Sequence, residues 1–225
     1  MCGIVGYIGN NQAAPFLLDG MSKLEYRGYD SAGIAVYEKG KITVEKCVGR
    51  LDSLRQKLDG HMPEGTMGIG HTRWATHGRP SDRNSHPHTD ASGEFVVVHN
   101  GIIENYLVLK EDLIAKGHKF VSETDTEVVA HLMAAYYDGD FEETVKRVLR
   151  VIDGSYSLVF MCAKEPEKII CTKKDNPLVI GLGEGENFIA SDIPAIIAKT
   201  RRTFIMSDGE IATVTKDSVW VQDIN

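Results

Sequence analysis

The sequence predicts an α+β fold built around antiparallel β-sheets. Hydrophobic residues recur at helical spacing mainly in the first two thirds of the chain, whereas the last third consists mostly of short apolar runs that predict strands. Turn signals at residues 207–209 and 216–217 separate some of these runs and predict hairpins, which join antiparallel strands. Repeated strand–helix–strand units around a parallel sheet are therefore disfavoured.

Residues 3–72 alternate strand-like runs with amphipathic helices. Apolar runs bounded by turn residues predict strands, and apolar residues three or four positions apart predict helices. The pattern predicts strands over 3–8, 32–37, 42–48 and 67–72 and helices over 14–24 and 51–58. The linker 38–41 contains Gly40, which suits the turn of a hairpin between the second and third of these strands.

Residues 73–93 form a long polar segment that we expect to be a loop. The segment is rich in histidine and contains prolines, and a long loop inside a compact domain is often functional. A strand over 95–98 and a helix over 107–114, closed by a glycine, follow the loop. The spacing Thr124-x-x-Glu127 is that of a capping box and predicts that the next helix begins near Thr124.

A further helix over 145–152 leads into the strand-rich part of the chain. The apolar runs there predict strands over 156–162, 168–172, 178–180 and 188–190. No tract rich in Pro, Gly or Ser divides the chain, and it contains no internal repeat. A chain of 225 residues can bury a substantial core, so we expect residues 1–225 to form one domain.

Composition and charge exclude several classes of protein. The chain has 25 Lys plus Arg against 32 Asp plus Glu, a net charge of −7, which is the wrong sign for binding a phosphate backbone and argues against nucleic acid as a partner. The apolar runs are far shorter than the roughly 20 residues that span a bilayer, so no membrane association is expected. The N-terminus lacks the basic region of a secretory signal, and these features together predict a cytoplasmic protein.

One of the four cysteines is distinguished by its position. Cys47, Cys162 and Cys171 lie in apolar, strand-like segments and are expected to be small buried side chains, and no C-x-x-C spacing indicates zinc or a redox pair. Cys2 follows Met1, whose removal would place a thiol and a free amine on one residue. These groups have unperturbed pKa values of about 8.5 and about 7.7 to 8, so the amine could relay the thiol proton without a histidine base. The alternative is an ordinary cysteine at the start of a strand.

Five motifs decide between these alternatives, because together they resemble the glutaminase domain of class II glutamine amidotransferases. The resemblance covers essentially the whole chain and is carried by MCGIVGYIG, LEYRGYDSAG, HTRWATHG, HNGIIEN and SETDTE. It implies hydrolysis of L-glutamine through a Cys2 thioester. It also implies the four-layer αββα sandwich of N-terminal-nucleophile hydrolases, a choice among α+β layouts that composition alone could not make.

The resemblance assigns catalytic roles to residues of three motifs. The side-chain amide of Asn100 and the backbone N–H of Gly101 would form the oxyanion hole for the tetrahedral intermediate. Arg27 and Gly28 would line the nucleophile and orient its amine, although Gly28 could equally mark a turn. On sequence alone, Asn100-Gly101 is also a strong hairpin signal, although the residues after it do not form an obvious return strand.

The resemblance also predicts a substrate-binding group that recognises the charged end of glutamine. Arg73 offers a planar fork for the α-carboxylate, and Asp125 would hold the α-ammonium, although Asp125 could also simply favour the first turn of a helix. Trp74 either closes over the substrate or buries its ring to anchor the loop. The complete predicted group is Arg73, Trp74, Thr76, His77, His86 and Asp125.

No cofactor or metal is expected. His86 and His88 have the i, i+2 spacing of possible metal ligands, but no Cys or carboxylate lies at a matching spacing. Within the family, the letters of LEYRGYDSAG and HTRWATHG resemble members in which sugar isomerase domains bind fructose 6-phosphate, use the ammonia to make glucosamine 6-phosphate, and form homodimers. No such domains lie within residues 1–225, so we expect this chain to represent the glutaminase part of a longer enzyme.

Three rival hypotheses remain open at this point. The first keeps the reaction and changes the acceptor, as in an amidophosphoribosyltransferase or an asparagine synthetase; Tyr26, Tyr29 and Trp74 in their motifs speak against it. The second is a non-catalytic glutamine-binding module with the same fold. The third is a Cys-His hydrolase in which a histidine activates Cys2.

Overall fold

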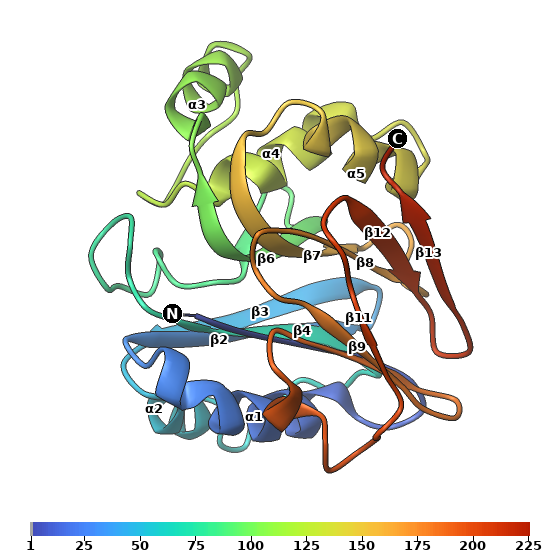
Figure 1. Cartoon of the computed structure of the whole chain (residues 1–225). Helices are drawn as coiled ribbons and strands as arrows, with labels where there is room; N and C mark the ends of the chain where they lie inside the picture. The colour runs from blue at the N-terminus through green and yellow to red at the C-terminus, as the bar shows by residue number, and fades with distance from the viewer. Residues whose placement is uncertain (1) are drawn as a thin grey trace.

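The computed structural model describes residues 2–225 and has four layers (Figure 1). Two antiparallel sheets lie face to face, with one group of helices below the lower sheet and another above the upper sheet. The predicted α+β class and the αββα sandwich are both confirmed. No helix among residues 2–225 is both long enough and apolar enough to cross a membrane.

The first sheet contains seven strands in the order β11-β9-β10-β1-β4-β2-β3. Its strands are β1 (Gly3–Ile8), β2 (Ser31–Glu38), β3 (Lys41–Val48), β4 (Met67–Arg73), β9 (Val179–Leu182), β10 (Asn187–Ala190) and β11 (Thr203–Ile205). Its outer face is covered by α1 (Ala13–Leu24) and α2 (Leu51–Lys57), with the short helices η1 (Glu25–Arg27) and η2 (Ile193–Ala195) nearby. The β1 strand therefore lies between β4 and β10, which are more than 100 residues apart in the sequence.

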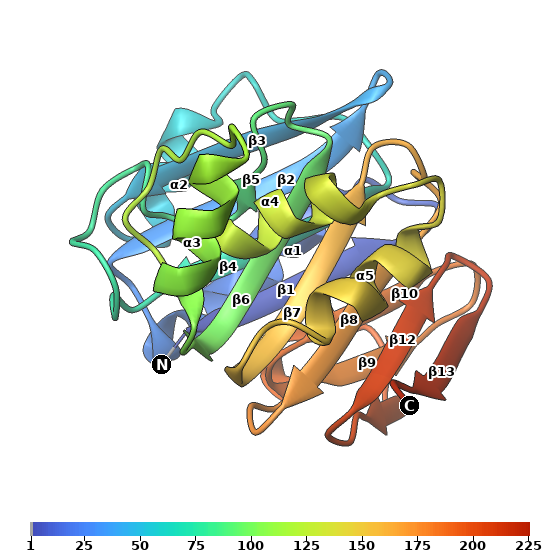
Figure 2. The same cartoon turned by 90° about the horizontal axis from the view of Figure 1, so that it is seen from above.

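The second sheet contains six strands in the order β13-β12-β8-β7-β6-β5. Its strands are β5 (His88–Thr89), β6 (Phe95–Ile103), β7 (Gly154–Cys162), β8 (Ile169–Lys174), β12 (Glu210–Val214) and β13 (Val219–Asp223). Figure 2 shows α4 (Glu127–Tyr136) and α5 (Phe141–Leu149) lying across this sheet, with α3 (Tyr106–Ala115) beside them. The α3 helix ends before Gly117, whose φ of +94° suits the turn that follows.

Central strands of the sandwich, such as β1 and β6, are apolar on both faces because each sheet packs on both sides. In β6, Val96 and Val98 belong to the core between the sheets, whereas Phe95 and Val97 belong to the core beneath α4 and α5. The same alternation places Ile4 of β1 between the sheets. Since side chains alternate along a strand, even-numbered positions of β1 and β6 face the layer between the sheets.

Two local predictions are wrong. The turn at 207–209 does not form a hairpin, because β11 pairs with β9 in the first sheet and β12 pairs with β8 in the second, so this turn carries the chain between sheets. The predicted capping box is also absent: α4 begins at Glu127, whose carboxylate accepts hydrogen bonds from the backbone N–H groups of Val121 and Ser122. The hairpin at 216–217 is confirmed by the pairing of β12 with β13.

The remaining elements agree with the sequence patterns apart from their ends. The hairpin of β2 and β3 turns through Lys39 and Gly40, both with positive φ. The segment 73–93 is a loop except for β5, which pairs with β6. The cysteines expected to be buried, Cys47, Cys162 and Cys171, have side chains that are at most 9% exposed.

Candidate active site

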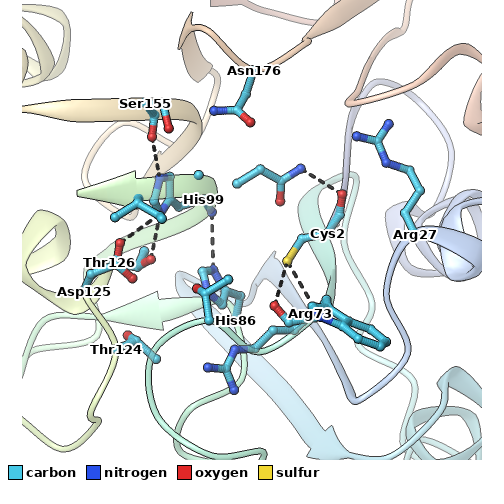
Figure 3. Close-up of a pocket in the computed structure, with 15 residues that line it drawn as sticks. Cys2, Arg27, Arg73, His86, His99, Thr124, Asp125, Thr126, Ser155 and Asn176 are labelled. Carbon is cyan, nitrogen blue, oxygen red and sulfur yellow. Dashed lines mark hydrogen bonds and ion pairs between the residues drawn. The ribbon is translucent and has the colours of Figure 1, made fainter. Parts of the chain in front are cut away.

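The candidate site lies beside the start of β1 and near the end of β6, on strands of the two different sheets. Cys2 precedes β1, and Asn100 lies on β6 with the same orientation as the buried Val98. A cavity of about 280 Å³ is found here, and all of the predicted site residues line it except Gly28 and His77. Figure 3 shows Arg27 and Arg73 on the same side of this cavity as Cys2. His99 and Asp125 lie on the opposite side.

The sulfur of Cys2 is held by the backbone of the loop after β4. The N–H of Trp74 donates a hydrogen bond to Sγ at 3.1 Å, and Sγ lies 3.4 Å from the carbonyl oxygen of Trp74 (Figure 3). Both hydrogen bonds involve Trp74, and neither involves a histidine. Burial raises the pKa of the Cys2 thiol, whereas the Trp74 hydrogen bond and the nearby Arg73 charge act in the opposite direction. The thiol is therefore protonated at neutral pH and needs a base to become a nucleophile.

Asn100 and Gly101 lie within β6 and not in a turn. Both residues pair with β7, so the hairpin interpretation of Asn-Gly is wrong. The Asn100 side chain donates a hydrogen bond from Nδ2 to the backbone oxygen of Cys2 at 3.0 Å. Gly101 has φ of +119°, and a Cβ at this position would lie 2.2 Å from the carbonyl oxygen of Ser155. Only glycine fits this backbone conformation and spacing.

Arg73 is almost fully buried at the end of β4, with 3% of its surface exposed. Its Nη2 donates to the carbonyl oxygens of His77 and Gly78, so the side chain supports the loop that follows it. Its other terminal nitrogen, Nη1, is buried without a hydrogen-bond partner among residues 2–225. A buried, unpaired guanidinium nitrogen beside a cavity is suited to binding an anionic group.

Trp74 and Thr76 lie on the exposed side of the cavity. The indole ring of Trp74 is 46% exposed and packs edge-on against Tyr29 at 5.3 Å between ring centroids. The ring is therefore not buried as a loop anchor would be. The loop itself is held instead by Asp30, whose carboxylate accepts a hydrogen bond from the N–H of Ala75.

Asp125 places a buried carboxylate on the opposite wall of the cavity. The residue is 4% exposed, and its Oδ2 accepts a hydrogen bond from the N–H of Ile103 at 2.7 Å. The residue precedes α4, so it does not lie in the first turn of that helix. His77 lies outside the cavity lining, but its Nδ1 is 3.9 Å from Oδ1 of Asp125. Its ring packs edge-on against Tyr106.

Arg27 and Gly28 lie at the end of η1. Arg27 lines the cavity, and its Nη1 lies 3.4 Å from Oδ2 of Asp192 and donates to the carbonyl oxygen of Ser191. Gly28 has extended backbone angles and ends η1, with its N–H donating to the carbonyl oxygen of Glu25. Gly28 is therefore set back from the cavity, beside a residue that lines it.

Four histidines, His71, His86, His88 and His99, form a buried cluster, and two of them, His86 and His99, line the cavity. The rings of His71 and His86 are stacked with centroids 4.0 Å apart, and His88 packs edge-on against His86 at 4.7 Å. The N–H of His99 donates to Nδ1 of His86 at 3.3 Å. Among residues 2–225, no group of three or more His, Cys, Asp or Glu side chains is arranged to hold a metal ion.

Comparison with known proteins identifies the family. The model of the glutamine amidotransferase domain family matches residues 71–198, which is more than half of the chain and includes the Arg73 loop, β6 and Asp125. The chain belongs to the glutamine amidotransferase family.

The relatives with high sequence identity share one name. The chain is 58% identical over 224 residues to the glutamine–fructose-6-phosphate aminotransferase (isomerizing) of Caldanaerobacter subterraneus, and 55% identical over 223 residues to that of Clostridium tetani. These alignments cover 100% and 99% of this amidotransferase chain but only 37% of each relative. The chain therefore spans little more than a third of the length of these curated relatives.

Solved structures of amidotransferases share the fold. A glutamine phosphoribosylpyrophosphate amidotransferase from B. subtilis superposes with a TM-score of 0.86 and 26% identity, covering 100% of this chain and 49% of that one. A glutamine aminotransferase class-II domain protein from Silicibacter pomeroyi superposes with a TM-score of 0.67 at 14% identity, with both chains fully covered. The much higher identity to the aminotransferases disfavours the phosphoribosyl rival.

Several residues that line the amidotransferase cavity were not predicted from the sequence. His99, Ile102, Thr124 and Thr126 lie inside motifs whose other letters were interpreted, so their motifs were the available signal. Ser155 and Asn176 come from β7 and the segment after β8, where no motif marks them. They reach the cavity because β7 pairs with β6 and β8 pairs with β7.

The buried histidines make the stability of this domain depend on pH. Burial lowers the pKa of His71 to about 3 and lowers the pKa values of His86, His88 and His99, so all four are neutral in the fold. Below pH 6.5 the unfolded chain takes up protons that the folded chain does not, so the free energy of unfolding falls as the pH falls. Each of His71, His86 and His88, whose pKa values are lowered furthest, contributes up to about 1.4 kcal/mol per pH unit in this range.

We therefore expect the free energy of unfolding to fall by several kcal/mol between pH 7.5 and pH 5.5, measured by urea unfolding. A His71→Gln variant, which cannot titrate, should show a shallower dependence by the contribution of one histidine. Equal free energies at the two pH values would contradict the neutral state of the cluster.

Proposed function

We propose that this chain hydrolyses L-glutamine to glutamate and ammonia through a thioester on Cys2. One observation carries the proposal: a thiol, an amide donor, a buried guanidinium with an unpaired nitrogen and a buried carboxylate line a single small cavity. The thiol and the Asn100 amide suit attack on a carboxamide, and the two charges suit the α-carboxylate and α-ammonium of an amino acid.

The proposed nucleophile is the Cys2 sulfur activated by its own α-amine. This role requires removal of Met1, which lies outside the described residues. The amine takes the thiol proton as Sγ attacks the side-chain amide carbon, and a tetrahedral intermediate forms. The C–N bond then breaks, and the amine returns the proton to the departing ammonia. Water activated by the same amine cleaves the thioester and releases glutamate.

The oxyanion of the intermediate would be stabilised by β6. The Nδ2 of Asn100 and the backbone N–H of Gly101 are the proposed donors, and loss of one such donor costs about 10² to 10³ in rate. The position of Asn100 next to the Cys2 backbone supports this assignment, since the reacting carbon must lie within bonding distance of Sγ. Arg27 and Gly28 are proposed to line the nucleophile, with Gly28 acting from behind Arg27.

The charged end of glutamine would be held across the cavity. Nη1 of Arg73 is proposed to bind the α-carboxylate and Asp125 the α-ammonium, so that both remote charges orient the amide toward the thiol. Thr76 and His86 line the cavity and are proposed as further contacts, and His77 would act from beside Asp125. Trp74 is proposed to cover the bound substrate, consistent with its exposed ring.

The names of the relatives support a larger assembly. We propose that residues 1–225 form one glutaminase domain and that, in a longer cytoplasmic enzyme, sugar isomerase domains use the ammonia to make glucosamine 6-phosphate from fructose 6-phosphate. A homodimer of that longer enzyme is part of the same proposal. This chain covers 37% of the length of the relative, so the remaining length of the relative could hold such domains.

An assay of two products tests the proposal. The chain with Met1 removed should release glutamate from L-glutamine but form no glucosamine 6-phosphate when fructose 6-phosphate is added. Glutamate release should stop after treatment with 6-diazo-5-oxo-L-norleucine, an electrophilic glutamine analogue. Absence of glutamate release from folded, processed protein would overturn the glutaminase assignment, and sugar formation by this chain alone would overturn the division of labour between domains.

A further inference from the structure

His71 links the two sheets directly behind Asn100. It lies on β4 of the first sheet with no exposed surface. Its Nε2 lies 3.0 Å from the carbonyl oxygen of His99 and 3.1 Å from Oδ1 of Asn100, both on β6 of the second sheet. One ring nitrogen therefore contacts the backbone of the opposite sheet and the side chain of the proposed oxyanion donor.

The backbone oxygen of His99 determines which nitrogen of His71 carries the proton. A carbonyl oxygen can only accept a hydrogen bond, so Nε2 of His71 must be protonated. Nδ1 has no hydrogen-bond partner among residues 2–225, which agrees with a neutral ring that carries its proton on Nε2 alone. Burial lowers the pKa of His71 to about 3, and the stacked ring of His86 covers one face. The same tautomer is therefore expected throughout the working pH range.

The protonated Nε2 in turn determines the orientation of the Asn100 amide. A donor at 3.1 Å must face the oxygen of the amide, so the amide nitrogen points to the other side. On that side Nδ2 donates one of its two hydrogens to the carbonyl oxygen of Cys2 at 3.0 Å. The second hydrogen is left for a ligand in the cavity. A flipped amide would place its oxygen against the Cys2 carbonyl and its NH₂ against the His71 N–H.

We propose that His71 is a positioning residue that holds the Asn100 amide with its nitrogen toward the reacting centre. This proposal rests on the proposed glutaminase function and adds a residue that positions one donor of its oxyanion hole. His71 itself does not touch the substrate, because it is absent from the cavity lining and lies behind Asn100. Its effect should therefore be seen in kcat and should pass entirely through Asn100.

A double-mutant cycle with glutamine as substrate tests this role. His71→Leu removes the donor and should lower kcat about 10- to 100-fold with KM within about threefold of the parent value. His71→Gln restores an N–H donor and should recover most of this loss. Once Asn100→Ala is present, adding His71→Leu should lower kcat by no more than about threefold, because the group that His71 orients is gone.

Two controls separate orientation from general damage. His131 is a matched buried histidine on α4 and is 1% exposed. Its Nε2 lies 2.8 Å from the Glu127 carboxylate, and it does not line the cavity. His131→Gln should leave kcat per folded molecule unchanged. If His71→Leu does not fold, ¹⁵N NMR of the parent chain still tests the tautomer, which should be neutral with the proton on Nε2 from pH 5 to pH 8.

The outcomes distinguish this proposal from the function on which it rests. Multiplicative losses in the cycle, an unchanged kcat in His71→Leu, or a proton on Nδ1 would each overturn the positioning role while leaving the glutaminase assignment intact. An unchanged kcat in Asn100→Ala would overturn the oxyanion assignment, and the role of His71 would fall with it. Loss in Asn100→Ala with a non-additive, rescued His71 series supports both.

Discussion

Replacing Cys2 with alanine is expected to lower kcat for glutamate release by about 10⁴-fold or more, because no other nucleophile can form the thioester. The sulfur lies in the cavity that Arg27, Arg73 and Asn100 also line, and among residues 2–225 its hydrogen bonds involve only the Trp74 backbone. Alanine removes only the sulfur, so the loss should appear in kcat without loss of the fold. Glutamate release under saturating glutamine, together with a thermal melt, measures both.

Cys47→Ala is the matched control for this change. Cys47 lies on β3 with 9% of its surface exposed and lines no part of the cavity, so its variant should retain the activity of the parent chain. Burial raises the pKa of the Cys47 thiol, which makes it a poor nucleophile at neutral pH. Glutamate release by Cys2→Ala at more than a hundredth of the parent rate would rule out the thioester mechanism.

Replacing Asp125 with asparagine is expected to lower kcat/KM for glutamine by about 10²- to 10³-fold, since a substrate ammonium would lose its buried charged partner. The asparagine oxygen can still accept the 2.7 Å hydrogen bond from the N–H of Ile103, so the local backbone should keep its position. The loss should therefore reflect the missing charge. Steady-state kinetics with glutamine give the ratio directly.

A substrate without the α-amino group separates recognition from structural damage. With glutaramate, the analogue of glutamine in which hydrogen replaces that group, the parent chain should already be slow, and Asp125→Asn should slow it little further. Asp138→Asn is the control: that carboxylate is exposed and pairs with Arg147 at 2.9 Å on the surface, so activity should not change. Equal losses with both substrates would show that Asp125 supports the fold and does not bind the ammonium.

The architecture could be predicted largely because the strands have distinctive patterns. Runs such as 95–98 are apolar at every position, as expected for strands packed on both faces, and the structure places alternate residues of β6 in two different cores. The local predictions that were wrong concerned features that depend on tertiary contacts. The 207–209 turn has ordinary turn residues. It connects the two sheets because β11 pairs with β9 and β12 pairs with β8.

Residues of the site could be predicted from the sequence only where they lie within a recognisable motif. Asn100-Gly101 illustrates the limit, since local preference favours a turn, but pairing with β7 keeps both residues in a strand, where Gly101 has a φ of +119°. Thr124 similarly has capping-box spacing but contacts His88 instead of capping a helix. Asn176 carries no local signal at all, because its place in the cavity depends on strand order.

Cooperation between the sulfur and the terminal nitrogen of Cys2 is tested most directly by comparing two forms of the chain. One form has Met1 removed, as verified by intact mass, and the other retains an extra residue before Cys2. After treatment with 6-diazo-5-oxo-L-norleucine, peptide mapping should find the label on the N-terminal Cys2 of the processed form, and only that form should release glutamate. Equal labelling and equal glutamate release by the extended form would contradict a catalytic role for the amine.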